Sequence, residues 1–213
     1  MKMFLHAVMF TLSLFVAGTV AADTPAAHAA QSPSADKITA AREAVRDLWT
    51  DHIFWVRNVV MATAAKNAAE RKTAETQVVA NAKQIAGVVG AYYGKAAGDQ
   101  MFTLLAGHWG AIKGYLDATY ANDQNARNKA FKDLNDNAAA IATFLSAANP
   151  NLPKATLLAL LTAHGAHHVT QINDVHAGQY DNEAANWSAM RSHMNIIADA
   201  LVDGIAKQFP EKF

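Results

Sequence analysis

The chain contains no cysteine, and this removes several kinds of chemistry at once. Disulfides, thiolate metal sites, covalent CxxCH haem attachment and thiol catalysis are all excluded. The chain also has no excess charge of either sign, because 18 lysines and arginines balance 18 aspartates and glutamates. This balance argues against a general nucleic-acid-binding protein, which needs a basic face. Proline is scarce, with five residues, which suits long helices better than a many-turned β fold.

The sequence has enough apolar side chains to build a core. Of its 213 residues, 52% are hydrophobic and 17% are charged, so the chain is too apolar to be a disordered protein. Its length is that of one domain of ordinary size. The function then has to be inferred largely from where the nine histidines stand.

The first segment is typical of a secretory signal. Lys2 precedes an apolar run over residues 4–20, and the run ends in small residues at Ala22, with a second candidate cleavage site at Ala29. We expect residues 1–22 to be a cleaved signal peptide, 23–35 a flexible lead-in, and 36–213 a single domain. The expected location is periplasmic or secreted, with no stable membrane insertion after cleavage.

Helical periodicity begins near Asp36 and continues to the end of the chain. Apolar residues recur at steps of three and four, and several of these seams contain a histidine. One such seam consists of Ile38, Ala41, Val45, Leu48, His52, Trp55, Val59 and Ala62. No stretch alternates with a period of two for long enough to form a strand, so the sequence predicts an all-α fold.

A threefold repeat organises these helices. The pattern Leu-(Leu/Trp)-x-x-His ends at His52, His108 and His164, which follow one another at intervals of 56 residues. A second signal, Ile-Ala, repeats at the same interval in the partner helices, starting at Ile85, Ile141 and Ile197. We therefore predict three antiparallel helical hairpins over residues 36–93, 94–149 and 153–209. They would form a bundle of five to six helices, depending on whether the second and third are continuous.

The register of the hairpins predicts a polar layer. Residues equidistant from a hairpin turn lie at the same height, so His52 faces Asn81 and His108 faces Asn137. In the third unit His164 faces His193, and His168 lies one helical turn away from His164. If the hairpins pack without a large axial shift, these side chains share one level inside the molecule.

Such a layer favours a transition-metal site. Neutral imidazole is a common ligand of zinc and copper, and three or four nitrogens complete the coordination of an ion. The candidate metal ligands are His52, His108, His164, His193 and His168. The amides of Asn81 and Asn137 are candidates to orient these ligands by hydrogen bonds to their other ring nitrogens. Met190 and Met194 are possible thioether ligands that would favour copper. The expected function is non-enzymatic binding of Cu or Zn in metal buffering, delivery or stress protection.

Other interpretations stay open. A His/Asn layer can be purely structural in an interaction protein without a cofactor, because imidazoles and amides satisfy one another. A non-covalent haem b held between histidines is a further alternative. The Glu-x-x-His pairs of a di-iron site are absent, as are the motifs of a nucleophile elbow, a Walker loop and a dinucleotide fold. No catalytic residue is therefore predicted, although a metal with an open position could support hydrolysis.

The sequence also resembles a known family. The run Leu48-Trp49-Thr50-Asp51-His52, followed by Trp55 and Arg57, is similar to the LWxxHxxWxR-type opening motif of a family of small exported bacterial helical-bundle proteins. Further matching positions, within a resemblance that spans about residues 48–209, are Tyr93-Gly94, His108, Asn137-Ala138, Ile141-Ala142, His164 and Ala198-Asp199. The family has no established activity, so the resemblance implies a shared fold and histidine layer without a catalytic role. His167, His168 and His193 depart from its pattern.

Overall fold

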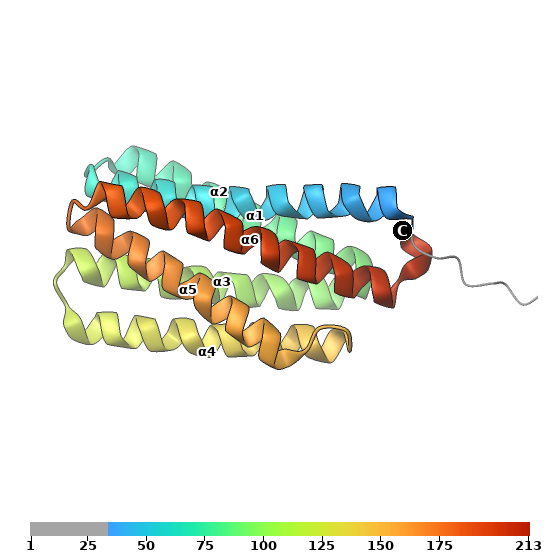
Figure 1. Cartoon of the computed structure of the whole chain (residues 1–213). Coiled ribbons are helices and arrows are strands. Elements are labelled where there is room, and N and C mark those ends of the chain that lie inside the picture. The colour runs from blue at the N-terminus through green and yellow to red at the C-terminus, as the bar shows by residue number, and fades with distance from the viewer. Residues whose placement is uncertain (1–33) are drawn as a thin grey trace, which may run out of the picture.

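The computed structural model describes residues 34–213, which form six long helices and one short 3-10 turn (Figure 1). The helices are α1 (Ala35–Ala64), α2 (Ala68–Tyr93), α3 (Lys95–Tyr120), α4 (Gln124–Ala148), α5 (Lys154–His176) and α6 (Tyr180–Gln208), followed by η1 (Pro210–Lys212). The predicted all-α fold and the three antiparallel hairpins α1–α2, α3–α4 and α5–α6 are confirmed. The predicted signal peptide, both cleavage sites and most of the lead-in lie outside the described residues.

The repeat extends to the turn inside each hairpin. Lys66, Asn122 and Gly178, again 56 residues apart, each adopt a positive φ, at 55°, 55° and 72°. The next residue caps the following helix in two of the three units, where the side chains of Asn67 and Asp123 accept a hydrogen bond from a backbone N–H of the first turn. One sequence pattern thus produces the same reversal of chain direction three times.

Helices α2 and α3 are separate, and glycines form the junction between them. Gly94 ends α2 with a φ of 89°, a conformation that L side chains rarely adopt. The chain then reverses, and Gly98 of α3 packs directly against Gly90 of α2. A Cβ on Gly98 would lie 3.0 Å from the carbonyl oxygen of Ala86. The two helices approach closely because neither glycine carries a side chain.

The six helices close into a ring. Each hairpin packs against the next through α2–α3 and α4–α5, and α6 returns to pack on α1. Helix α5 also contacts α1 and α3 directly, so the first helices of the hairpins face one another across the interior. The sequence repeat therefore becomes an approximate threefold arrangement, in which equivalent residues of α1, α3 and α5 meet.

Core side chains are stacked in layers along this interior. The layer on one side of the repeated histidines contains Trp49, Leu105 and Leu161, which are 56 residues apart and buried. A second layer lies on the other side, two helical turns from the histidines, and consists of Val60, Leu116 and Ile172, which are also 56 residues apart. The side chains of both layers are only 0–8% exposed. Apolar layers therefore enclose the level at which the histidines lie.

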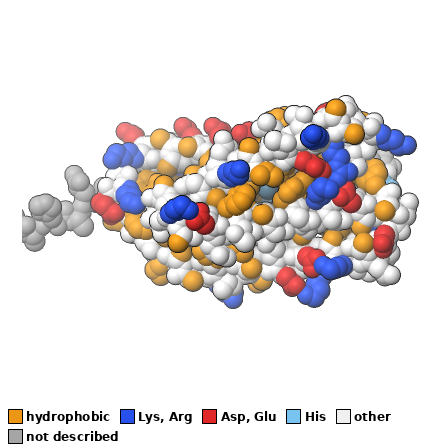
Figure 2. Space-filling model, turned by 180° about the vertical axis from the view of Figure 1, so that it is seen from behind, with side chains coloured by type: hydrophobic (Ala, Val, Ile, Leu, Met, Phe, Trp, Pro, Cys, Tyr) orange, Lys and Arg blue, Asp and Glu red, His pale blue; other side chains and the backbone are white. Residues whose placement is uncertain are grey.

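The outer surface of the bundle is polar and mixed in charge. On the face seen in Figure 2, basic and acidic side chains are interspersed with hydrophobic ones. Ion pairs join neighbouring helices, as between Arg46 of α1 and Asp199 of α6. Within residues 34–213, no helix combines the length and apolarity required to cross a membrane.

Candidate metal centre

Four histidines from three helices meet in the interior of the bundle. His52 comes from α1, His108 from α3, and both His164 and His168 from α5. Their residues are only 1–5% exposed. His52, His108 and His164 meet because they occupy the same position of the repeat, and His168 joins them because a residue one turn further on lies on the same face of a helix. We refer to these four residues as the histidine cluster.

The imidazole rings of the histidine cluster touch one another. The ring centres of the three repeated histidines are 5.5–6.0 Å apart, and His108 and His164 are stacked. One nitrogen can be chosen from each of the four rings such that all four lie within 4.8 Å of one another. The Nε2 atoms of His164 and His168 are 3.2 Å apart. The predicted convergence of the repeated histidines at one level is therefore confirmed.

Most ring nitrogens of the histidine cluster have no hydrogen-bond partner. Both nitrogens of His52 and of His108 are buried and unpartnered, as are the Nδ1 atoms of His164 and His168. Buried polar atoms are normally hydrogen-bonded, since leaving one unpaired costs about 1–3 kcal/mol. Six such nitrogens in one place are compatible with a metal site.

Burial keeps these imidazoles neutral. Desolvation first, and then the nearby His108, lower the pKa of His52 to about 3. Desolvation likewise lowers the pKa of His108 to about 4, although the adjacent Asn137 side chain acts in the opposite direction. For His164 and His168 the pKa is well below the usual range, first through burial and then through repulsion by the other histidines. Neutral imidazole is the form that binds a metal ion.

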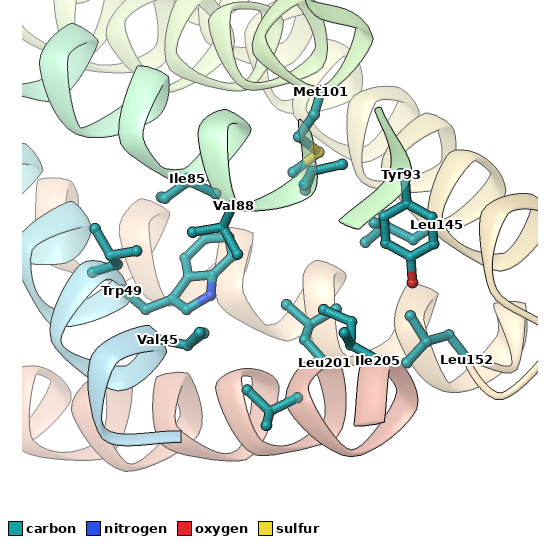
Figure 3. A pocket seen from close by; sticks show the side chains of 13 residues that line it. Val45, Trp49, Ile85, Val88, Tyr93, Met101, Leu145, Leu152, Leu201 and Ile205 are labelled. Carbon is teal, nitrogen blue, oxygen red and sulfur yellow. The ribbon is translucent and has the colours of Figure 1, made fainter. Parts of the chain in front are cut away.

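The histidine cluster has an apolar cavity on one side. This cavity has a volume of about 50 Å³ and extends to Tyr93 and Leu152 (Figure 3). Its other lining residues are also apolar and include Trp49, Met101, Leu145 and Leu201. A smaller space of about 20 Å³ shares those four residues and reaches His108 and His164. The edge-on contact of Trp49 with His52, with ring centres 5.7 Å apart, lies at the same boundary. These apolar surroundings lower the local dielectric constant and so strengthen any electrostatic interaction at the cluster.

Asn81, Asn137 and His193 lie beside the cluster and have a shared backbone role. Each donates a side-chain N–H to the carbonyl oxygen 33 positions earlier, namely that of Leu48, Leu104 and Leu160, at 2.8–2.9 Å. The structure therefore places His193 with the two asparagines on the outer helices, and outside the four converging histidines. The Oδ1 atoms of Asn81 and Asn137 are buried without a partner.

The two methionines proposed as thioether ligands are core residues of α6. Met190 and Met194 are both fully buried in the apolar cluster that surrounds Trp49 and Ile53. The positions equivalent to Met190 in the other hairpins are Val78 and Leu134, which fill the core in the same way. Met190 therefore occupies a core-packing position that all three hairpins share.

A buried ion pair that the sequence did not single out as a site joins Arg57 of α1 to Glu183 of α6, beside Gln171, which lies one turn beyond His168 on α5. Glu183 is 1% exposed and accepts two hydrogen bonds of 2.6 Å from Arg57 and a third of 3.0 Å from Gln171. Arg57 first, and then Gln171, hold the pKa of Glu183 below its usual value against the opposing effect of burial. The only sequence signal was the apolar spacing around Gln171, which gave no reason to expect a carboxylate beside it.

Comparisons with protein-family models, with curated proteins and with solved structures find no match to this chain. The resemblance of the Leu48–Arg57 motif to a family of exported bundle proteins stays an expectation.

Proposed function

We propose that this protein binds a transition-metal ion through His52, His108, His164 and His168. The observation that carries the proposal is the convergence of four buried, neutral imidazoles, of whose eight ring nitrogens six have no partner. A bound cation would use one nitrogen of each ring, and would therefore give a partner to at most four of these six nitrogens.

The spacing of the nitrogens supports a tetrahedral ion. Metal–nitrogen bonds of 2.0–2.1 Å place the nitrogens of a tetrahedron about 3.3–3.4 Å apart. The separation of 3.2 Å between the Nε2 atoms of His164 and His168 is close to this value, and small rotations of the other rings would close distances of up to 4.8 Å. An all-imidazole set suits zinc or copper, so we propose Cu or Zn as the ion.

Four protein ligands would leave no open coordination position. Closed sites store or deliver a metal ion or stabilise a fold, whereas catalytic sites keep a position for water or substrate. The proposed role is therefore metal buffering, delivery or stress protection. The apolar run at the start of the sequence adds the proposal that this occurs outside the cytoplasm, where a chain without cysteine depends on histidine ligands.

The two alternative interpretations fit the cluster less well. A purely structural layer would satisfy its nitrogens internally, whereas the histidine cluster contains a single ring-to-ring hydrogen bond, between His164 and His168. A haem would have to separate its axial ligands and insert a wide flat ring, whereas these rings are in mutual contact at 4.5–6.2 Å between centres.

Elemental analysis of protein purified from its native compartment tests the proposal. We expect close to one Cu or Zn per chain, lost from His108→Ala and from His164→Ala. His176→Ala is the matched control, because His176 is exposed on the last turn of α5 and lies against Tyr120 outside the cluster. The proposal is contradicted if the native protein contains no Cu or Zn and also fails to bind either ion in a titration. It is also contradicted if His108→Ala, His164→Ala and His176→Ala contain equal amounts of metal.

A further inference from the structure

The third hairpin carries four histidines that its two sister hairpins lack; His176 lies at the far end of α5 against Tyr120, and the other three are His167, His168 and His193. Equivalent positions, 56 and 112 residues earlier, hold other residue types: Val56 and Ile112 for His168, Trp55 and Ala111 for His167, Asn81 and Asn137 for His193. His168 belongs to the histidine cluster. His167 and His193 stay outside it, and neither is needed to repeat the fold, since the other two hairpins form without them.

His167 and His193 face each other between α5 and α6. Their ring centres are 5.5 Å apart, with an angle of 48° between the ring planes. Two imidazoles that share one ion at 2.0–2.1 Å hold their ring centres about 5–6 Å apart when the bond angle at the ion is near tetrahedral or trigonal. The observed separation therefore suits a bridging ion.

Hydrogen bonds fix which nitrogen of each ring is available. The Nδ1–H of His167 donates to Oδ1 of Asn186 at 2.7 Å, and Asn186 donates in turn to the His167 carbonyl oxygen. The Nε2–H of His193 donates to the carbonyl oxygen of Leu160 at 2.8 Å. Each ring thus keeps one nitrogen with a free lone pair, Nε2 in His167 and Nδ1 in His193. Metal-binding histidines are typically oriented in this way, through the N–H of the other nitrogen.

The pair lies between the buried cluster and the surface. His167 and His193 are partly exposed, whereas the adjacent His164 and His168 are buried. His167 directly precedes His168 on α5 and follows His164 by three residues, and His193 of α6 lies against His167, so the pair is next to the cluster. An ion held by this pair would be accessible to solvent and close to the four buried ligands.

We propose that His167 and His193 form a second transition-metal site, which takes up zinc or copper from solution next to the histidine cluster. Solvent water would complete the coordination, so this site exchanges its ion faster than a closed four-histidine site. Binding at the pair does not depend on the proposed function of the cluster. The passage of the ion onward to His164 and His168 does rest on that function.

NMR of the histidine side chains during titration of the folded chain with Zn²⁺ at pH 7 tests the second site. We expect Zn²⁺ to shift the ring resonances of both His167 and His193. His193→Asn should abolish the shift of His167, and His167→Ala should abolish that of His193. His193→Asn preserves the fold, because Asn81 and Asn137 hold the equivalent carbonyl groups in the other hairpins. Circular dichroism and the Tm should confirm this for both variants.

Three outcomes separate the two sites. If the ring signals of His167 respond to Zn²⁺ identically in the wild type and in His193→Asn, or do not respond at all, the second site is disproved. If the pair responds while the signals of the four buried histidines do not, the second site stands and the proposed function of the cluster fails. If both respond, onward passage predicts that the buried signals change at least several-fold more slowly in His193→Asn, and an unchanged rate would contradict it.

Discussion

The imidazoles of the histidine cluster are positioned by packing more than by hydrogen bonds. No ring nitrogen of His52 or His108 is hydrogen-bonded, although the Asn137 side chain is adjacent to His108, and Trp49 contacts His52 edge-on. Metal-binding histidines usually donate their second N–H to a fixed acceptor, and the unpaired Oδ1 atoms of Asn81 and Asn137 are the nearest candidates by register. A small ring rotation on metal binding would therefore satisfy both the ion and the amides.

The substitution His108→Leu separates a metal site from a structural layer. In the metal-free protein, leucine removes two buried unpartnered nitrogens and replaces them with apolar atoms, so the free energy of unfolding should rise by about 1–2 kcal/mol. Metal affinity should fall by at least tenfold, because one of four ligands is lost. Urea unfolding after chelation, together with Zn²⁺ titration, measures both quantities. A structural layer would give a loss of stability and no change in metal affinity.

The buried imidazoles also predict that acid destabilises the metal-free protein. The pKa is about 3 for His52 and about 4 for His108 in the folded state, against about 6.5 in the unfolded chain. Below pH 6.5 the unfolded state therefore binds more protons, and stability falls as the pH falls toward 4. At pH 5 each of these two histidines should cost about 2 kcal/mol relative to pH 8, at 1.36 kcal/mol per pKa unit.

Urea unfolding between pH 8 and pH 4.5 measures this dependence. His108→Leu is the matched variant, because it removes one of the two groups and should make the stability curve less steep in the same range. A stability that is constant from pH 8 to pH 5 in the wild type would show that these imidazoles are hydrated in solution.

The sequence predicted the level of these histidines along the bundle axis better than the direction in which their side chains point. Repetition placed His52, His108 and His164 at one level, and equal distances from the turns placed His193 at the same level. Distance from a turn does not state which way a side chain points. His193 belongs to an outer helix and hydrogen-bonds to the flank of α5, whereas His168 lies one turn along α5 on the face that already points inward. The spacing i, i+4 was the available signal for His168.

Among the helices, the contact between α2 and α3 depends on the absence of two side chains. A Cβ on Gly98 would meet the Ala86 carbonyl oxygen at 3.0 Å and the Gly90 Cα at 3.1 Å, and both are backbone atoms that cannot move aside alone. The sequence left open whether the second and third helices are continuous, and it predicted no packing role for these glycines. Their role in close packing could not be predicted, because it depends on which residue of the neighbouring helix lies opposite.

Gly98→Ala should therefore separate α2 from α3 and destabilise the fold by about 1–3 kcal/mol. Gly87→Ala is the matched control, since a Cβ there has no neighbouring atom within 4 Å and glycine is the weaker helix former by up to about 1 kcal/mol. Chemical denaturation should thus show opposite signs for two identical substitutions in adjoining helices. Equal effects of the two substitutions would mean that the close approach at Gly98 does not occur in solution.

Over the whole molecule, polar contacts repeat between hairpins as well as within them. Arg71 of the first hairpin pairs with Asp117 of the second, and Arg127 of the second contacts Asn173 of the third, each pair 46 residues apart. The third hairpin has an acidic residue, Glu183, at the position equivalent to Arg71 and Arg127. Glu183 accepts a hydrogen bond from Arg57 of the first hairpin, and this contact closes the ring. The sequence predicted three hairpins. It could not predict that they form a closed ring, since the contact between α6 and α1 joins segments about 150 residues apart.

Closure of the ring leads to a prediction about folding. The histidine cluster takes one ligand from each of the first two hairpins and two from the third, so an intact site exists only when all three hairpins are docked. An ion that binds the folded state alone stabilises it by about 2.7 kcal/mol when its free concentration is 100 times its Kd. We therefore expect saturating Zn²⁺ to raise the Tm of the whole bundle in a single cooperative transition, and chelation to reverse the rise.

Differential scanning calorimetry of the wild type and of His108→Leu measures this change in Tm, with the variant expected to show little or no metal-dependent increase. A Tm that rises equally in both proteins would place the stabilising ion elsewhere, and two separate transitions in the metal-bound protein would show that the cluster does not join the three hairpins.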